Sequence, residues 1–256
     1  MTARALALLA LAGTTTLGAP AGTMRYRIDQ TIDQAVDASV IGGGQQQQRF
    51  TVSIFLSVRL TDTAGGRVVD AVVDSMRADS APVPQAALDS ARGTPLHGLL
   101  DTAGHVTDVR ALRDTPLAPQ LTDVVSRLYP GLRAGLRVGD GLTDTARTSS
   151  AVGGGTLTVR RITTYKATGT EARREGRATK VETAFTSSVS GTQQTPAGPA
   201  QIEGSGSGSG AHYVAPDGRY LGGGYSMTTK LTLAGAFAPQ PLPVTLTETF
   251  AVSALP

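Results

Sequence analysis

The stretch from Phe50 to Leu60 alternates apolar and polar side chains, and this alternation constrains the fold more than any other feature of the chain. Every even-numbered residue in the stretch is apolar. The odd-numbered residues carry a hydroxyl or a charge, with Phe55 as the exception. Because successive side chains of a β-strand point to opposite faces, the pattern predicts a strand with one buried face and one solvated face. Such half-buried strands are typical of antiparallel sheets.

The same alternation recurs along most of the chain and predicts a sheet of many long strands. It begins at Tyr26, and the segment GGGQQQQ joins the first two strands. A loop over residues 78–93 carries one helical turn, and a hairpin follows over residues 95–112. Further strands are predicted within residues 62–76, from residue 157, and over residues 181–189, 225–233 and 244–252.

One helix is predicted over residues 116–128. Thr115 is placed to cap it, Pro116 occupies its first position, and the segment YPG at residues 129–131 ends it. Its apolar residues fall at helical spacing and form one stripe: Leu117, Leu121, Val124, Val125 and Leu128. An amphipathic helix needs an apolar surface to lie on, and the sheet is the only candidate.

The segment IEGSGSGSGAH, residues 202–212, places glycine on one parity and serine on the other. A flexible linker between two domains is one interpretation of such a composition. The alternation, and the turn-forming residues APDG that follow it, favour a strand with one face stripped of side chains. Glycine in a strand often marks a place where another group approaches the backbone closely. We therefore expect either the helix at residues 116–128 or a ligand to lie against this face.

The charge and the residue usage argue against several classes of function. The net charge of +3 is spread along the chain, and the densest basic group, RREGRATK at residues 173–180, contains no aromatic residue. We interpret this group as a solvated hairpin turn and expect no nucleic-acid partner. The chain has no Cys, which excludes thiol chemistry, and no Trp, which argues against a carbohydrate-binding platform.

The N-terminus has the pattern of a signal peptide over residues 1–21. Arg4 precedes a short apolar run, and Ala19 and Ala21 provide the small residues that precede a cleavage site. The run is too short to span a bilayer. We expect export to the periplasm or the medium, one β-rich domain over residues 22–256, and no transmembrane segment after cleavage.

No motif indicates catalysis or a metal ion. His97, His105 and His212 lack the spacing of a zinc site, although the first two flank one hairpin and are placed to approach each other. The segment GSGSGSG matches neither a nucleophile elbow nor a phosphate-binding loop. Asp70 and Asp74 share one face of a strand, where we interpret them as solvated carboxylates.

Glu248 is the most informative polar residue. It shares its parity with Val244, Leu246, Phe250 and Val252, so it points where apolar side chains point. A buried carboxylate is costly unless it is paired. We expect Glu248 to meet an arginine such as Arg161, to line a wet cavity, or to lie at a bulge or near an edge.

Three segments carry a resemblance to known proteins: LYPGLRAGLRVGDGLTDT, TTYKATGT and VAPDGRYLG. With the glycine-alternating strand, they resemble an uncharacterised family of exported bacterial β-proteins. Many members of that family have a Trp after the VGD segment, whereas this chain has Leu142. More distantly, the architecture is similar to the lipoprotein-carrier half-barrel, a curved antiparallel sheet closed on its concave side by helices. The resemblance implies an apolar cavity able to take an acyl chain.

Together these observations predict a mainly β protein: a long-stranded, curved antiparallel sheet, open or half-closed as a barrel, with one principal amphipathic helix on its concave side. We expect a binding protein without enzymatic activity or cofactor, which holds a lipid or acyl chain between sheet and helix. The alternative is a ligand-free module of the bacterial cell envelope that contacts another protein. The residues predicted to line the ligand site are Ile54, Leu56, Leu121, Val125, Gly206, Gly208, Glu248 and Phe250.

Overall fold

The computed structural model describes residues 23–79, 83–131, 137–152, 154–174, 176–195, 198–236, 238 and 240–256. The predicted signal peptide, residues 1–21, lies outside the described residues. In these ranges no helix has the length and apolar character needed to cross a membrane.

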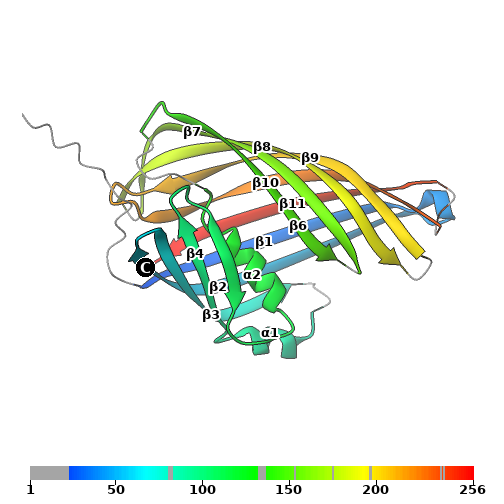
Figure 1. The fold of residues 1–256 in the computed structure, drawn as a ribbon, viewed down its shortest axis with the longest axis horizontal. Helices are drawn as coiled ribbons and strands as arrows, with labels where there is room; N and C mark the ends of the chain where they lie inside the picture. Colours follow the sequence, from blue (N-terminus) through cyan, green and yellow to red (C-terminus); the bar gives the residue numbers. More distant parts are fainter. Residues whose placement is uncertain are drawn as a thin grey trace, which may run out of the picture.

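The strands of the described residues form one antiparallel sheet of eleven strands, in the order β5-β4-β3-β2-β1-β11-β10-β9-β8-β7-β6 (Figure 1). The first and last strands of the chain, β1 and β11, are neighbours in the middle of the sheet, so every other ladder joins strands consecutive in sequence. The predicted fold class is therefore confirmed. The strands are β1 (Thr23–Asp37), β2 (Gln45–Thr63), β3 (Gly66–Asp79), β4 (Pro95–Asp101), β5 (Val106–Ala111), β6 (Gly141–Val152), β7 (Gly155–Arg173), β8 (Gly176–Thr195), β9 (Gly198–Val214), β10 (Tyr220–Gly235) and β11 (Leu242–Leu255).

The glycine-alternating segment is β9, a central strand paired with β8 and β10, and not a linker. The predicted turn at residues 173–180 is shorter than expected: β7 runs to Arg173 and β8 begins at Gly176, while residue 175 lies outside the described residues. Gln45 to Gln48, expected in the connection between the first two strands, instead extend β2, and the turn is made by the short 3-10 helix η1 (Ser39–Ile41) with Gly42 to Gly44.

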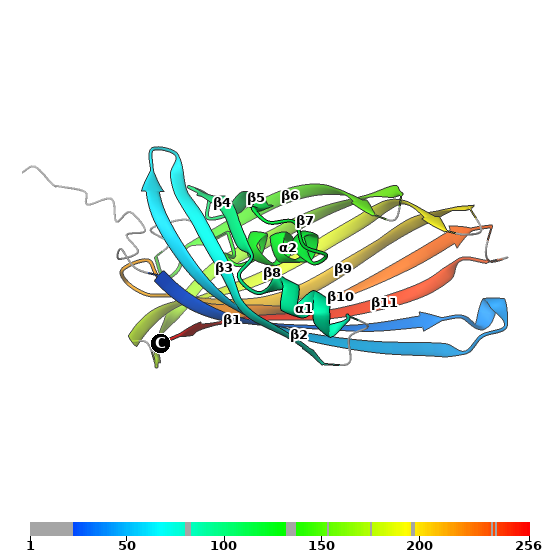
Figure 2. The same ribbon diagram turned by 90° about the horizontal axis from the view of Figure 1, so that it is seen from below.

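The sheet curves strongly, and the two helices α1 (Gln85–Ala91) and α2 (Ala118–Ser126) lie on its concave side (Figure 2). Both pack near the β3–β5 end: α1 contacts β3, and α2 contacts β4 and β5. The α2 stripe of Leu121, Val124 and Val125 is buried against the sheet, as the apolar periodicity predicts.

The predicted start of this helix is wrong. The Thr115 carbonyl accepts a hydrogen bond from the N–H of Ala118 at 3.0 Å, which makes a turn before the helix begins. Leu117 takes the N-cap position without a side-chain cap, and a proline lies in the first helical turn. That proline is Pro119 rather than Pro116, and it is tolerated there because the first N–H groups of a helix have no partner within it.

Among the described residues, a side-chain pair links the two edges of the sheet, β5 and β6. His105, at the turn before β5, places Nε2 3.1 Å from Oδ2 of Asp144 on β6. The N–H of Gly131 donates to the carbonyl of Gly104 in the same turn at 3.0 Å. No ladder joins β5 to β6 in the described part of the chain, so the sheet is open.

The main apolar core fills the concave side beneath the helices. It combines residues from β1 to β5 and β11 with both helices, and Leu121, Val125 and Leu128 are almost completely buried in it. Tyr26, Tyr129 and Tyr220 meet at one end, with ring centroids 5.6 to 6.3 Å apart.

The convex face is hydrophilic. On four adjacent strands the side chains of Thr186, Ser207, Thr228 and Thr247 follow one another across the sheet. The first three of these are exposed. The alternation predicted for each strand therefore separates a concave face that carries the core from a convex face that contacts water.

Candidate ligand-binding site on the concave face

The strand registers arrange the concave residues of β7 to β1 in rows that run across the strands. Two central rows carry the polar groups, and two further rows at the end remote from the helices carry mainly apolar residues. The central rows are Thr163, Phe185, Gly208, Met227, Glu248 and Ile32, and Arg161, Ser187, Gly206, Thr229, Leu246 and Gln34. The outer rows, called here the apolar band, are Val159, Val189, Gly204, Leu231, Val244 and Val36, and Leu157, Gly191, Ile202, Leu233 and Leu242.

Neighbouring side chains lean over the glycine face of β9. A Cβ built on Gly208 would lie 2.5 Å from Cζ of Phe185, and one on Gly210 would lie 2.8 Å from Cβ of Tyr225. The rings of Phe185 on β8 and Tyr225 on β10 meet edge to face across β9, with centroids 5.5 Å apart. Side chains from the flanking strands, rather than the helix or a ligand, therefore make the close approach that the glycines permit.

A ladder of rings and guanidinium groups crosses the concave face. Tyr225 stacks on Phe250 with centroids 5.5 Å apart. The guanidinium of Arg127, which follows α2, lies 4.9 Å from the centroid of Phe250. At the other end Arg161 on β7 lies 5.0 Å from the centroid of Phe185. Each of these contacts is a favourable cation–π or aromatic pair, and together they fix the central rows.

Glu248 pairs with Arg127 and not with Arg161. Oε1 of Glu248 lies 2.5 Å from Nη1 of Arg127 and accepts a second hydrogen bond from Nε2 of Gln30 at 2.8 Å. The same Nη1 donates to the Tyr225 hydroxyl at 2.9 Å, and Nη2 of Arg127 pairs with Asp123. Sequence reasoning named the wrong arginine because Arg127 reaches the site from the end of a helix, where strand parity gives no information.

Burial shapes the protonation of this cluster. Burial alone lowers the pKa of Arg127, but Tyr225, Glu248 and Asp123 outweigh it and raise that pKa above its ordinary value. Burial also raises the pKa of the Tyr225 phenol, against the opposing effect of Arg127. The guanidinium is therefore charged at every physiological pH and the phenol is neutral.

The other predicted site residues separate into two groups. Ile54, Leu56, Leu121, Val125 and Phe250 are each 1 or 2% exposed and belong to the packed core under α2. Gly206 and Gly208 lie on β9, beyond Arg127 and outside that core. Side chains therefore fill the interface between α2 and the sheet. No helix of the described residues covers the apolar band.

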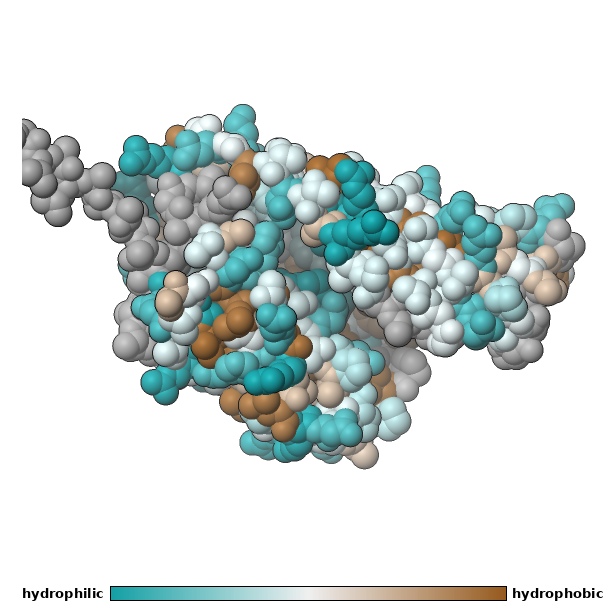
Figure 3. Space-filling model, viewed as in Figure 1, coloured by the Kyte–Doolittle hydropathy of each residue, from teal (hydrophilic) through white to brown (hydrophobic). Residues whose placement is uncertain are grey.

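In the space-filling view, the molecule is hollowed between the part that carries the helices and the part formed by β6 to β9 (Figure 3). The side chains of the apolar band are mostly half-buried, with Val244 and Ile202 more deeply buried. Leu231 leans over Gly204 as Phe185 does over Gly208. This part of the concave face offers continuous apolar surface beside charged and hydroxyl groups.

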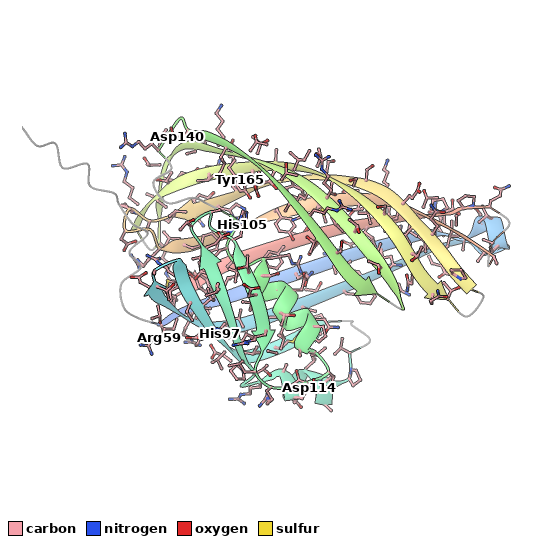
Figure 4. All side chains as sticks on the ribbon, in the orientation of Figure 1. Arg59, His97, His105, Asp114, Asp140 and Tyr165 are labelled. Carbon is pink, nitrogen blue, oxygen red and sulfur yellow. The ribbon has the colours of Figure 1, made fainter. Side chains whose placement is uncertain are left out.

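The histidines form no common site. His97 pairs with Asp70 at 2.9 Å. His105 pairs with Asp144 on β6 and lies near Tyr165, at a separate place on the molecule (Figure 4). His212 is buried beside Tyr220. Asp74 accepts hydrogen bonds from Ser57. Within the described residues no group of three or more His, Asp and Glu side chains is placed to hold a metal ion.

We expect Gly208→Ala to lower the free energy of unfolding by about 2 kcal/mol, because the added methyl meets Phe185 and the carbonyl of Ser226. Urea denaturation measures the change. Gly169→Ala on β7 is the matched control, since nothing lies within 4 Å of the position of its Cβ. Equal stability of the two variants would show that the aromatic pair does not occupy the glycine face.

No family model matches the chain, and no curated protein matches it. Among solved structures, OccAB4 of Acinetobacter baumannii is similar over 91% of this chain and 98% of its own, with 8% identity and a TM-score of 0.29. OccK2 (OpdF) of Pseudomonas aeruginosa in complex with glucuronate has the same coverage, with 7% identity and a TM-score of 0.25. Outer-membrane expressed OmpT of Vibrio cholerae covers 93% and 99%, with 6% identity and a TM-score of 0.19.

At these TM-scores the likeness concerns the general arrangement of strands and carries no argument about function or compartment.

Proposed function

We propose that this chain is a non-enzymatic binding protein that holds a lipid or acyl chain on the uncovered part of the concave face. The observation that carries the proposal is the apolar band, which no helix covers in the described residues, since α1 contacts β3 and α2 contacts β4 and β5. Covering about 200 Å² of such surface stabilises a complex by roughly 5 kcal/mol before the costs of association.

The location of this site differs from the one predicted from sequence. An acyl chain between α2 and the sheet would have to displace Leu121, Val125 and their core partners. Close-packed interiors do not open without a large cost in free energy. The apolar band requires no such displacement. The signal-peptide pattern and the resemblance to the lipoprotein-carrier half-barrel support an exported protein of the bacterial envelope.

We expect decanoate to bind the folded chain, as measured by isothermal titration calorimetry, and Leu231→Asp to weaken binding at least tenfold. The carboxylate introduces a charge into the apolar band, where it costs free energy when an acyl chain excludes water. Thr232→Asp, on the convex face of the same strand, is the matched control and should bind as the unmodified chain does. Circular dichroism melting confirms that both variants fold.

Failure of the unmodified chain to bind any acyl probe would overturn the proposal. It would instead favour the ligand-free envelope module. Equal weakening by both variants would likewise contradict a site on the concave face.

A further inference from the structure

We infer that Arg161, Ser187 and Thr229 form a binding site for the anionic head group, a carboxylate or phosphate, of an acyl ligand. This inference rests on the proposed function and adds the chemical class of the ligand. The three residues lie on one cross-strand row, together with Gly206 between the two hydroxyl residues. The adjacent row along the strands is the first row of the apolar band. A head group on the Arg161 row therefore places its chain directly on apolar surface.

Arg161 is the cation of the central rows that has no carboxylate partner among the described residues. Its guanidinium crosses from β7 toward β10, over the ring of Phe185 at 5.0 Å, and places Nη2 3.8 Å from Sδ of Met227. Arg127, at the other end of the aromatic ladder, pairs with both Glu248 and Asp123. A half-buried guanidinium loses hydration, and an anion restores that loss best.

Two hydroxyl residues lie on the same cross-strand row as Arg161. Ser187 and Thr229 are 8% and 5% exposed. A Cβ built on Gly206 would lie 2.6 Å from Oγ1 of Thr229 and 2.9 Å from Oγ of Ser187, so both oxygens lie over the glycine. A hydroxyl group can donate one hydrogen bond and accept others, so these two side chains have the chemistry to donate to an anionic oxygen.

The donor set has the chemistry of an oxyanion site. A guanidinium donates two parallel hydrogen bonds to a carboxylate or phosphate, and the hydroxyls each donate one more. The neighbouring carboxylates of the concave face are already engaged, Glu248 by Arg127 and Gln30, and Asp144 by His105. The absence of a side chain at Gly206 leaves room for the hydroxyls of Ser187 and Thr229 to lie over β9.

The test compares three ligands of one chain length, decanoate, decyl phosphate and decan-1-ol, by calorimetry on the folded chain. We expect at least one of the two anions to bind at least tenfold more tightly than the alcohol, and the stronger of them identifies the head group. We expect Arg161→Gln to abolish this preference and Ser187→Ala with Thr229→Val to reduce it. Arg160→Gln, which removes an arginine from the opposite face of β7, should leave it unchanged.

The outcomes separate the two proposals. Binding of all three ligands with equal affinity would overturn the head-group site and leave the acyl-binding proposal intact. An anion preference that survives Arg161→Gln, in a variant whose melting temperature is unchanged, would also overturn it. Failure of all three ligands to bind would overturn the proposed function itself. Arg161→Lys should retain part of the preference, because it keeps the charge but loses the bidentate geometry.

Discussion

Replacing Glu248 with leucine should lower the free energy of unfolding by about 4 kcal/mol, the largest effect expected from any single substitution on the concave face. The side chains of Arg127 and Glu248 are only 20% and 13% exposed, so removal of the carboxylate leaves a buried guanidinium with Asp123 alone as its counter-charge. The Tyr225 phenol also loses the fixed position of its donor. Urea denaturation at neutral pH measures the change.

Two comparisons isolate the ion pair. Glu203→Leu removes an exposed carboxylate from the convex face of β9 and should change stability by less than about 0.5 kcal/mol. The double variant Arg127→Leu with Glu248→Leu should be more stable than Glu248→Leu alone, because no unpaired charge remains. A Glu248→Leu variant within about 1 kcal/mol of the unmodified chain would contradict the buried pair.

Acidification should destabilise the chain through His212. This residue is 7% exposed, and its Nδ1 lies 3.0 Å from the hydroxyl oxygen of Tyr220. Burial lowers its pKa from 6.5 to about 4. The unfolded chain therefore binds a proton between about pH 6.5 and pH 4 that the folded chain excludes, so stability is full above pH 6.5 and falls as the pH drops toward 4. The shift corresponds to a loss of about 3 kcal/mol.

The measurement is the free energy of unfolding of the unmodified chain and of His212→Phe from pH 7 to pH 4. We expect the variant to lack about 3 kcal/mol of the pH-dependent loss, whatever its stability at pH 7. His97→Gln is the control, since His97 lies partly exposed beside Asp70. Identical pH profiles for the unmodified chain and His212→Phe would show that His212 is not buried in its neutral form.

The strands were predictable from sequence because alternation reports directly on which face is buried. Phe50 to Leu60, the glycine strand and the strand around Phe250 each take the faces their parity predicts. The pairing of β1 with β11 was not predictable from the sequence, because local patterns carry no information on which distant strands pair. The start of α2 was predicted wrongly because Pro116 and Pro119 can each occupy a first helical turn. A turn closed by the hydrogen bond from the Ala118 N–H to the Thr115 carbonyl precedes the helix, so Pro119 takes that position.

The candidate site was predictable only in part. The parity of Glu248 correctly indicated a carboxylate that faces the interior, and an arginine partner was one of three alternatives; the partner, Arg127, enters from the helical segment and lies outside any strand pattern. The glycine face correctly indicated a close approach. What approaches is set by the register of β8 and β10, which puts Phe185 and Tyr225 on either side of β9. Arg161 has no carboxylate partner among the described residues. This also depends on the strand registers, so it could not be predicted from the sequence.

Native mass spectrometry of the chain from Gly22 onward, purified from a bacterial envelope without detergent, will show whether the protein carries an acyl ligand. We expect a reproducible added mass that organic extraction removes, that lipid analysis identifies as an acyl compound, and that Leu231→Asp diminishes. A clean mass for the chain alone, unchanged after incubation with mixed fatty acids and phospholipids, would contradict an acyl-binding function.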